Sequence, residues 1–349
     1  MANKRIEDIG MTYAEFEKKN RKMHKVLTGI MPFDYVTSGG IPCGRIIELA
    51  GVPMAGKSTI SFYIMNSFIR DFPDKKVLYI DLEHALDKTW AIKNNFDVYD
   101  EHFRIIDPDS GEETLRIAEM AIRTGEFSLV VLDSLVSMAF DDEQTYKVAN
   151  DGTTTTEKIG VLPKKLTSWL KRNVPLIADS NAALFILNQA RANISPYGGA
   201  TTIPGGFAKD HYSSIRMEVR PKQISEGSGD NLEVLGVNSI YKCTKNKVGP
   251  FGRRAELIIL TATGLNVKES NIEFLCNNGF IKRAGPYYEY NGNKYLGMEK
   301  LKEAFEDIDW MDTWYKNTHL LAFLNGGYSN LEAEDGEGEQ TPELQEVDY

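Results

Sequence analysis

The segment GVPMAGKST, residues 51–59, has the glycine, lysine and hydroxyl spacing GxxxxGK[ST] of a phosphate-binding loop. Glycines allow backbone N–H groups to curl around a phosphate at the start of a helix. Lys57 would neutralise the β- and γ-phosphates of a nucleotide, and Ser58 would bind Mg²⁺. The alternative is a glycine-rich turn that only packs. The phosphate site would comprise Gly51, Val52, Pro53, Met54, Ala55, Gly56, Lys57, Ser58 and Thr59.

Two carboxylates follow apolar runs that are expected to lie beside this loop. Asp133 comes at the end of FSLVVLDS (127–134), where it would hold the water shell of the metal. Glu83 comes just after KVLYIDL (76–82) and would orient and deprotonate a water that attacks the γ-phosphate. Asp81 lies nearer the strand interior, so we expect a structural role for it.

The elements that position these residues are visible as apolar patterns. Continuous apolar runs predict buried parallel strands at 45–50, 76–82, 127–134 and 182–188. Helical stretches such as 58–70 and 112–124 fit between them as right-handed βαβ units. Later runs alternate apolar and polar residues, which favours antiparallel strands extending the same sheet, at 213–220, 237–244 and 255–262.

The two ends of the chain differ in charge. Residues 12–25 begin with a capping box, Thr12 and Glu15, and predict a basic helix that packs against the main body or a neighbouring subunit. Residues 331–349 carry eight acidic and no basic side chains, so a net charge of −10 becomes −2 without them. We expect this tail to be disordered, either as a solubility tail or as a competitor for a basic groove.

Composition excludes several classes of protein. No run of eighteen apolar residues occurs, so no membrane partner is expected, and MANKRIEDIG lacks the apolar region of an export signal. The three cysteines are far apart in the sequence and have no CxxC spacing. This argues against a disulfide framework or a zinc site and favours a reducing cytosol.

Several motifs in order resemble the RecA family of recombinases: GGIPCGRIIELAG, GVPMAGKST, IDLEHALD, VVLDS, FILNQ and KNKVGPF. The resemblance runs from about residue 36 to about 298 and implies an α/β fold, a RecA-type phosphate-loop ATPase core with a mostly parallel central sheet. The implied divisions are an N-terminal helical docking segment, the core, a small C-terminal α/β domain and the acidic tail, at 1–35, 36–267, 268–328 and 329–349.

The resemblance also implies a role for each matching residue, with ATP and Mg²⁺ as cofactors. Glu83 would activate the hydrolytic water, and Asp87 and Trp90 would flank the adenine. Gln189, at the end of FILNQ, would sense the γ-phosphate. Lys245 and Lys247 would reach the ATP of a neighbouring subunit, where a cation stabilises the charge of the transition state.

Two DNA-binding loops are implied, at about 146–160 and 190–206. The second contains the uncharged stretch NISPYGGATTIPGG, so we expect apolar wedges and backbone contacts there, with cations at its ends. Lys165 lies near the exit of the first loop. The predicted DNA-binding residues are Lys158, Ile159, Gly160, Lys164, Arg191, Ile194, Tyr197, Gly198, Gly199, Thr201, Thr202, Ile203, Gly205, Gly206 and Lys209.

The resemblance predicts a DNA-dependent ATPase that forms a helical filament on single-stranded DNA and exchanges strands with a duplex. It implies a homo-oligomer in the cytoplasm of a bacterium, or of the host of a virus, with single-strand-binding and loader proteins as further partners. Two alternatives stay open. One is a ring-forming helicase of the same core fold, and the other is a non-catalytic scaffold that coats DNA and uses ATP only to assemble.

Overall fold

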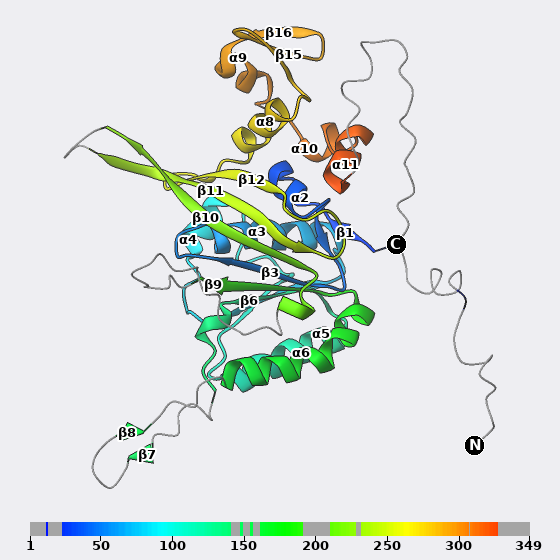
Figure 1. The fold of residues 1–349 in the computed structure, drawn as a ribbon, viewed down its shortest axis with the longest axis vertical. Coiled ribbons are helices and arrows are strands. Elements are labelled where there is room, and N and C mark those ends of the chain that lie inside the picture. Colours follow the sequence, from blue (N-terminus) through cyan, green and yellow to red (C-terminus); the bar gives the residue numbers. More distant parts are fainter. Residues whose placement is uncertain are drawn as a thin grey trace, which may run out of the picture.

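A computed structural model describes residues 12, 23–140, 147–148, 154–155, 161–190, 210–227, 232–306 and 308–326. Within these ranges the largest sheet has nine strands in the order β13-β12-β11-β10-β3-β9-β6-β4-β5. Helices cover both of its faces, and a smaller group of helices and strands lies at one end (Figure 1). No helix in the described part of the chain is both long and apolar enough to cross a bilayer.

The four continuous apolar runs are parallel strands, as predicted: β3 (Ile46–Gly51), β4 (Lys76–Asp81), β6 (Phe127–Asp133) and β9 (Ala183–Gln189). Every residue of β3 is buried, because helices pack on both sides of the sheet. A fifth parallel strand, β5 (Phe103–Ile106), lies at the edge and has exposed residues, which hid it from the sequence pattern.

The alternating runs form β10 (Ile215–Glu226), β11 (Glu233–Asn246) and β12 (Arg254–Leu260), followed by the short β13 (Gly264–Leu265). They extend the same sheet, but the antiparallel prediction is wrong for one side of β10, which pairs parallel to β3 and antiparallel to β11. Alternation of apolar and polar residues indicates that one face of a strand is exposed, but it does not indicate whether the strand runs parallel or antiparallel to its neighbour. Beyond Val219 and before Gly236 these strands continue as a projecting two-stranded arm (Figure 1).

Helix α3 (Lys57–Asp71) packs on one face of the sheet, while α5 (Gly111–Thr124) and α6 (Val161–Ser180) pack on the other (Figure 1). The helices predicted at 58–70 and 112–124 are therefore confirmed. Ser110 caps α5 by accepting a hydrogen bond from the backbone N–H of Glu113. The shorter helical segments in this region are α2 (Met31–Val36), α4 (Lys88–Lys93) and the 3₁₀ turn η2 (Leu135–Ser137).

The C-terminal part has its own apolar cluster, to which Met31 of α2 also belongs. Its elements are α8 (Val267–Asn277), β14 (Lys282–Ala284), β15 (Tyr287–Tyr290), β16 (Asn293–Leu296), α9 (Gly297–Ala304), α10 (Trp310–Thr313) and α11 (Thr318–Asn325). Two short strand pairs complete the description: β1 (Lys25–Val26) with β2 (Ile41–Pro42), and β7 (Lys147–Val148) with β8 (Thr154–Thr155).

The end of the helix predicted at 12–25 is wrong. Met23 and His24 are not helical, and Lys25 begins β1. Lys25 donates to the carbonyls of Ser38 (2.6 Å) and Val248 (3.1 Å), which holds this segment in an extended form against the body. Most of the remaining predicted helix, 13–22, lies outside the described residues, as does the tail 331–349.

A buried carboxylate joins the core to the C-terminal part. Asp34 accepts hydrogen bonds from the backbone N–H and hydroxyl of Thr28, from the backbone N–H of Gly29 and from the hydroxyl of Tyr315. Burial raises the pKa of Asp34 to about 6, although the hydrogen bonds, that of Tyr315 foremost, act to lower it. Tyr315 therefore stabilises the ionised form of a side chain that burial disfavours.

We predict that Tyr315→Phe lowers the free energy of unfolding by about 1–3 kcal/mol, because a hydrogen bond to a buried carboxylate is lost. Without this donor the pKa of Asp34 rises further. The loss is then larger at pH 7.5, where the wild-type carboxyl is ionised, than at pH 5, where both proteins hold it protonated. Urea unfolding at both pH values, followed by tryptophan fluorescence, measures this.

The control for that experiment is Tyr287→Phe, which removes the hydroxyl of an exposed tyrosine in β15 and should change stability little. An equal loss at the two pH values would contradict the proposed link between Tyr315 and the charge of Asp34.

Candidate functional site

The phosphate-loop sequence joins β3 to α3, and its backbone is shaped by two residues with positive φ, Met54 (60°) and Gly56 (84°). A Cβ on Gly56 would lie 2.3 Å from Cδ1 of Ile259, and one on Gly51 would lie 2.6 Å from the carbonyl oxygen of Val219. Neither position has room for a side chain. Met54 is 86% exposed, so the tip of the loop faces outward.

Lys57 lies inside this loop. Its amine donates to the carbonyls of Gly51 (3.0 Å) and Val52 (2.9 Å), and the side chain is buried. Burial lowers the pKa of Lys57, while the carboxylates of Asp133 and Glu83 act to raise it. A buried cation beside two carboxylates and a turn shaped by glycine suits a polyphosphate, which would add the negative charge that balances the cation.

Asp133, at the end of β6, faces the start of α3. Its Oδ2 accepts hydrogen bonds from Ser58 Oγ (2.9 Å) and from the hydroxyl of Tyr79 in β4. Burial raises the pKa of Asp133, and these two hydrogen bonds oppose the shift. The hydroxyl and the carboxylate predicted to serve Mg²⁺ therefore lie together, and their oxygen chemistry fits that ion.

Glu83 lies at the same edge of the sheet. Its Oε1 accepts hydrogen bonds from Ser134 Oγ and from Gln189 Nε2, the last residue of β9. The structure thus connects a carboxylate after β4 to the residue before the second predicted DNA loop. Ser134 was missed in the sequence, where it reads only as the end of a strand. Asp81 binds the backbone N–H groups of Ala85 and Leu86, as expected of a structural residue.

The predicted adenine residues lie on the neighbouring helix. Asp87 caps α4 by accepting from the backbone N–H of Trp90 (3.0 Å). The indole of Trp90 donates to the hydroxyl of Thr59 in α3 (3.0 Å) and is half-buried. Trp90 is therefore anchored beside the phosphate loop.

Lys245 and Lys247 lie elsewhere. In the sheet Lys245 pairs with Arg216, which pairs with Glu48, three residues or about 10 Å along β3 before Gly51. Their amines bind the carbonyl of His211 (3.1 and 2.7 Å), and that of Lys245 also binds the carbonyl of Asp210. Burial and then the charge of Lys247 lower the pKa of Lys245. The two lysines point towards the end of the sheet opposite the phosphate loop.

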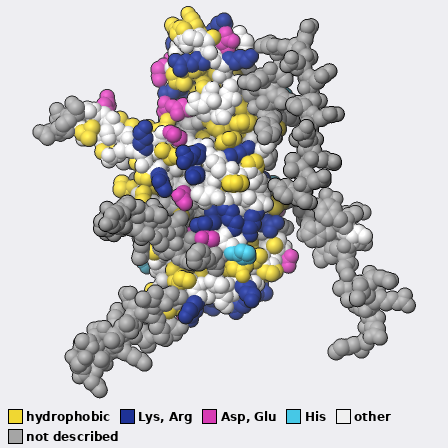
Figure 2. Space-filling view, in the orientation of Figure 1, with side chains coloured by type: hydrophobic (Ala, Val, Ile, Leu, Met, Phe, Trp, Pro, Cys, Tyr) yellow, Lys and Arg dark blue, Asp and Glu magenta, His cyan; other side chains and the backbone are white. Residues whose placement is uncertain are grey.

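A hollow of about 410 Å³ beside these lysines is lined by Lys25, Arg45 and Lys247 together with Met23, Ser214 and Val248. A band of Lys and Arg side chains crosses the middle of the face shown in Figure 2. The positive side chains at this end of the sheet include Lys25, which was predicted to lie in the basic helix 12–25, and Arg45, which the sequence pattern did not single out.

A buried network crosses three strands between the two ends. Glu48 in β3 is 1% exposed; it accepts from Asn188 Nδ2 in β9 (2.9 Å) and from Arg216 Nε in β10 (2.7 Å). Arg216 also pairs with Asp210 (3.1 Å). Asn188 lies at the end of β9 and Asp210 lies just before β10, so the network joins the end of one strand to the approach to the other.

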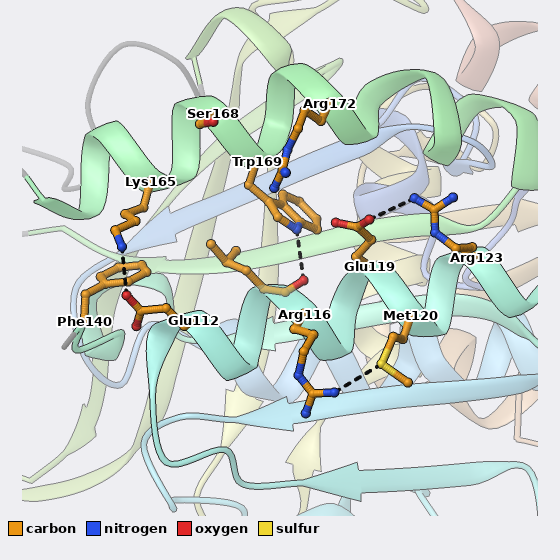
Figure 3. A pocket seen from close by; sticks show the side chains of 11 residues that line it. Glu112, Arg116, Glu119, Met120, Arg123, Phe140, Lys165, Ser168, Trp169 and Arg172 are labelled. Atoms are coloured by element: carbon orange, nitrogen blue, oxygen red, sulfur yellow. Dashed lines mark hydrogen bonds and ion pairs between the residues drawn. The ribbon is translucent and has the colours of Figure 1, made fainter. Parts of the chain in front are cut away.

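Of the predicted DNA-binding residues, only Lys164 is within the described part of the chain, where it is exposed on α6. The neighbouring Lys165 pairs with Glu112 of α5 (3.0 Å) along a groove of about 390 Å³ between the two helices (Figure 3). Lys171 and Arg172 are also exposed on α6, two turns further on; they were not named from the sequence, because this helix was not predicted.

The remaining DNA-binding predictions lie outside the described residues: Lys158, Ile159, Gly160, Arg191, Ile194, Tyr197, Gly198, Gly199, Thr201, Thr202, Ile203, Gly205, Gly206 and Lys209.

Together, the fold and the site define an α/β protein in which a phosphate-loop sequence joins the central strand of a mostly parallel sheet to a helix. The family model for the RecA N-terminal domain matches residues 9–266. The chain therefore belongs to the RecA family, and the α/β fold class is confirmed.

Curated relatives agree with this assignment. A Protein RecA of Teredinibacter turnerae is 32% identical over 286 residues, which cover 81% of this chain and 80% of the relative. A Protein RecA of Staphylococcus carnosus is 28% identical over 335 residues, covering 93% and 89%. The similarity thus extends beyond the residues matched by the family model.

We predict that Gly56→Ala lowers the free energy of unfolding by about 1–3 kcal/mol, because the residue has positive φ and its new Cβ meets Ile259. Gly125→Ala is the matched control, with φ of 73° and nothing within 4 Å of the added atom. Its smaller loss measures the backbone strain alone.

Ile259→Val removes the atom that Gly56→Ala would strike, so the double variant should lose less than the sum of the two single losses. Urea unfolding of the four proteins checks this, and strict additivity would rule out the contact as the cause.

Proposed function

We propose that this protein is an ATP-dependent DNA recombinase that forms a filament on single-stranded DNA and catalyses pairing and strand exchange with a duplex. The observation that carries the proposal is the contact of Glu83 with Gln189, which links the carboxylate beside the phosphate loop to the base of a predicted DNA-binding loop. ATP would then control DNA binding through a few hydrogen bonds.

In this proposal the backbone N–H groups of 51–59 and the amine of Lys57 hold the phosphates. Lys57 exchanges its two carbonyl partners for phosphate oxygens. Ser58 and Asp133 would hold Mg²⁺, which would supply charge neutralisation for the phosphates. Trp90 and Asp87 flank the base, since Trp90 is anchored to Thr59 at the edge of the loop.

Glu83 serves as the base that takes a proton from the attacking water. Ser134 and Gln189 both donate to the same carboxylate oxygen, which orients it. When a γ-phosphate approaches, Gln189 turns from Glu83 to that group, which moves the residues that follow it. This exchange of partners is a two-state element of the kind that a nucleotide switch needs.

The position of Lys245 and Lys247 supports assembly. They face away from the phosphate loop of their own subunit, so they serve the nucleotide of another copy. A contact that joins one end of a subunit to the opposite end of the next is heterologous and produces a ring or an open helix. The lysines leave the carbonyl of His211 and stabilise transition-state charge across the contact.

For DNA, we propose that phosphates lie along the exposed cations of α6, beginning with Lys164 and continuing to Lys171 and Arg172. The uncharged loop 193–206 enters the base stack, with Ile194, Tyr197 and Ile203 as candidate wedges. These contacts touch no base edges, so binding is independent of sequence.

A strand-exchange assay with ATP tests the proposal directly, and electron microscopy with single-stranded DNA and a slowly hydrolysed ATP analogue tests the assembly. Helical filaments together with exchanged strands are expected. Closed rings without strand exchange would instead identify a motor of the same fold.

We predict that Glu83→Gln lowers DNA-stimulated ATP turnover by about two to four orders of magnitude while filaments still form, because an amide oxygen can accept the hydrogen bonds of Ser134 and Gln189 but cannot take a proton from water. Lys57→Ala should abolish nucleotide binding, and filaments with it. Phosphate release and electron microscopy measure the two properties. Unchanged turnover in Glu83→Gln would support a scaffold that does not use ATP hydrolysis.

The arrangement of the lysines predicts complementation between inactive variants. Glu83→Gln and the double variant Lys245→Ala/Lys247→Ala should each be inactive alone. Mixed in equal amounts, they should form intact sites at about a quarter of their contacts, since one copy supplies the carboxylate and the other the lysines. If the mixture hydrolyses no more ATP than its components, the lysines act within their own subunit.

A further inference from the structure

Tyr79 is a buried tyrosine whose hydroxyl takes part in the candidate site. It lies in the middle of the apolar run of β4 and is 1% exposed, so by sequence it reads as a core residue. Its hydroxyl donates to Oδ2 of Asp133 on the adjacent strand β6. A phenylalanine would fill the same volume, so packing alone does not require the hydroxyl.

The backbone places the two groups in register. Tyr79 pairs with Val131 and Asp81 with Asp133 in the parallel ladder, and the N–H of Leu82 binds the carbonyl of Asp133 (2.6 Å). The carboxylate is thus fixed through its main chain at the end of β6. The orientation of the carboxylate plane depends on what binds its oxygens.

Both donors to this carboxylate bind the same oxygen. Ser58 Oγ and the Tyr79 hydroxyl each reach Oδ2, and Oδ1 accepts no hydrogen bond from the described residues. Ser58 and Tyr79 differ in what they can do next. Ser58 lies in the first turn of α3 and would turn its oxygen to the metal, whereas Tyr79 is buried in the core between the sheet and α3 and stays in place.

We propose that Tyr79 is a positioning residue for the Mg²⁺ site: its hydroxyl would keep the Asp133 carboxylate in one orientation when Ser58 turns its own oxygen to the metal. This inference rests on the proposed assignment of Ser58 and Asp133 to the metal. The hydroxyl binds Oδ2, which leaves Oδ1 to accept another donor, and it stabilises the negative charge of a carboxylate that is buried.

The test is nucleotide binding without turnover. A fluorescent, slowly hydrolysed ATP analogue is bound to the full chain at a series of Mg²⁺ concentrations. In Tyr79→Phe the Mg²⁺ concentration for half-maximal binding should rise about 10-fold, as when an outer partner of a metal ligand is removed. Affinity for the analogue without Mg²⁺ should be unchanged, because the hydrogen bonds of the Tyr79 hydroxyl go to Asp133 and Ser58, the two residues assigned to the metal.

Tyr63→Phe is the matched control. Tyr63 is a buried tyrosine of α3 whose hydroxyl donates to the carbonyl of Leu265 (3.4 Å) and also interacts with the side chain of Asn95, neither of which belongs to the carboxylate cluster. It should leave the Mg²⁺ dependence unchanged. If Tyr79→Phe and Tyr63→Phe behave alike, or if Tyr79→Phe weakens binding equally with and without Mg²⁺, the hydroxyl has no positioning role and the inference is wrong.

Asp133→Asn separates this inference from the proposal on which it rests. Asp133→Asn alone should raise the half-maximal Mg²⁺ concentration at least as much as Tyr79→Phe, and adding Tyr79→Phe should then change little further. If Asp133→Asn has no effect, the metal assignment itself fails. If Asp133→Asn raises the half-maximal Mg²⁺ concentration and Tyr79→Phe raises it by the same factor again in the double variant, Tyr79 acts on a group other than Asp133.

Discussion

The interaction on which the arrangement of this molecule depends is the buried contact of Glu48 with Asn188 and Arg216. A carboxylate in the most buried strand of a sheet is unfavourable unless it is paired and fully hydrogen-bonded. Its partners come from the two strands on either side, so the charge can be satisfied only in one register of β9, β3 and β10. That register sets the position of the phosphate loop at the end of β3 and of Gln189 at the end of β9. It also places Arg216 beside Asp210.

The carboxyl ends of the parallel strands bring the residues of the candidate site together. Lys57, Glu83, Asp133 and Gln189 come from four separate places in the sequence and meet because β3, β4, β6 and β9 end at one edge. Each of these side chains is hydrogen-bonded to another group of the site or to the loop backbone, which restrains its orientation. In the proposed mechanism these bonds are the ones exchanged when a nucleotide binds.

Sequence patterns predicted the parallel strands and the phosphate loop because continuous apolar runs and glycine spacing are local properties. The partner of β10 could not be predicted, since alternation in 215–220 is compatible with either direction. Helix α6 was missed; it contains Pro175 in its interior. Lys25 was predicted to be helical because it follows a charged stretch. Its amine instead donates to the carbonyls of Ser38 and Val248, which are brought together only in the folded chain.

Polar residues inside apolar runs were the least visible part of the site. Glu48, Tyr79 and Asn188 each stand in a strand that reads as core, and their hydrogen bonds join neighbouring strands. Sequence spacing cannot show such contacts, because they depend on strand order. The family resemblance supplied roles for residues in recurrent motifs and was silent about these three.

The separation of the phosphate loop from Lys245 and Lys247 makes each subunit directional. In a filament of the proposed kind, the terminal subunit at one tip keeps a nucleotide that no neighbour's lysines reach, while the subunit at the other tip presents lysines with nothing to act on. The two tips are then chemically unlike before any DNA or partner protein is bound. The rates at which subunits are gained and lost would differ between the two tips. Nucleotides in the interior would be hydrolysed, while the nucleotide at the tip that no lysines reach would stay intact.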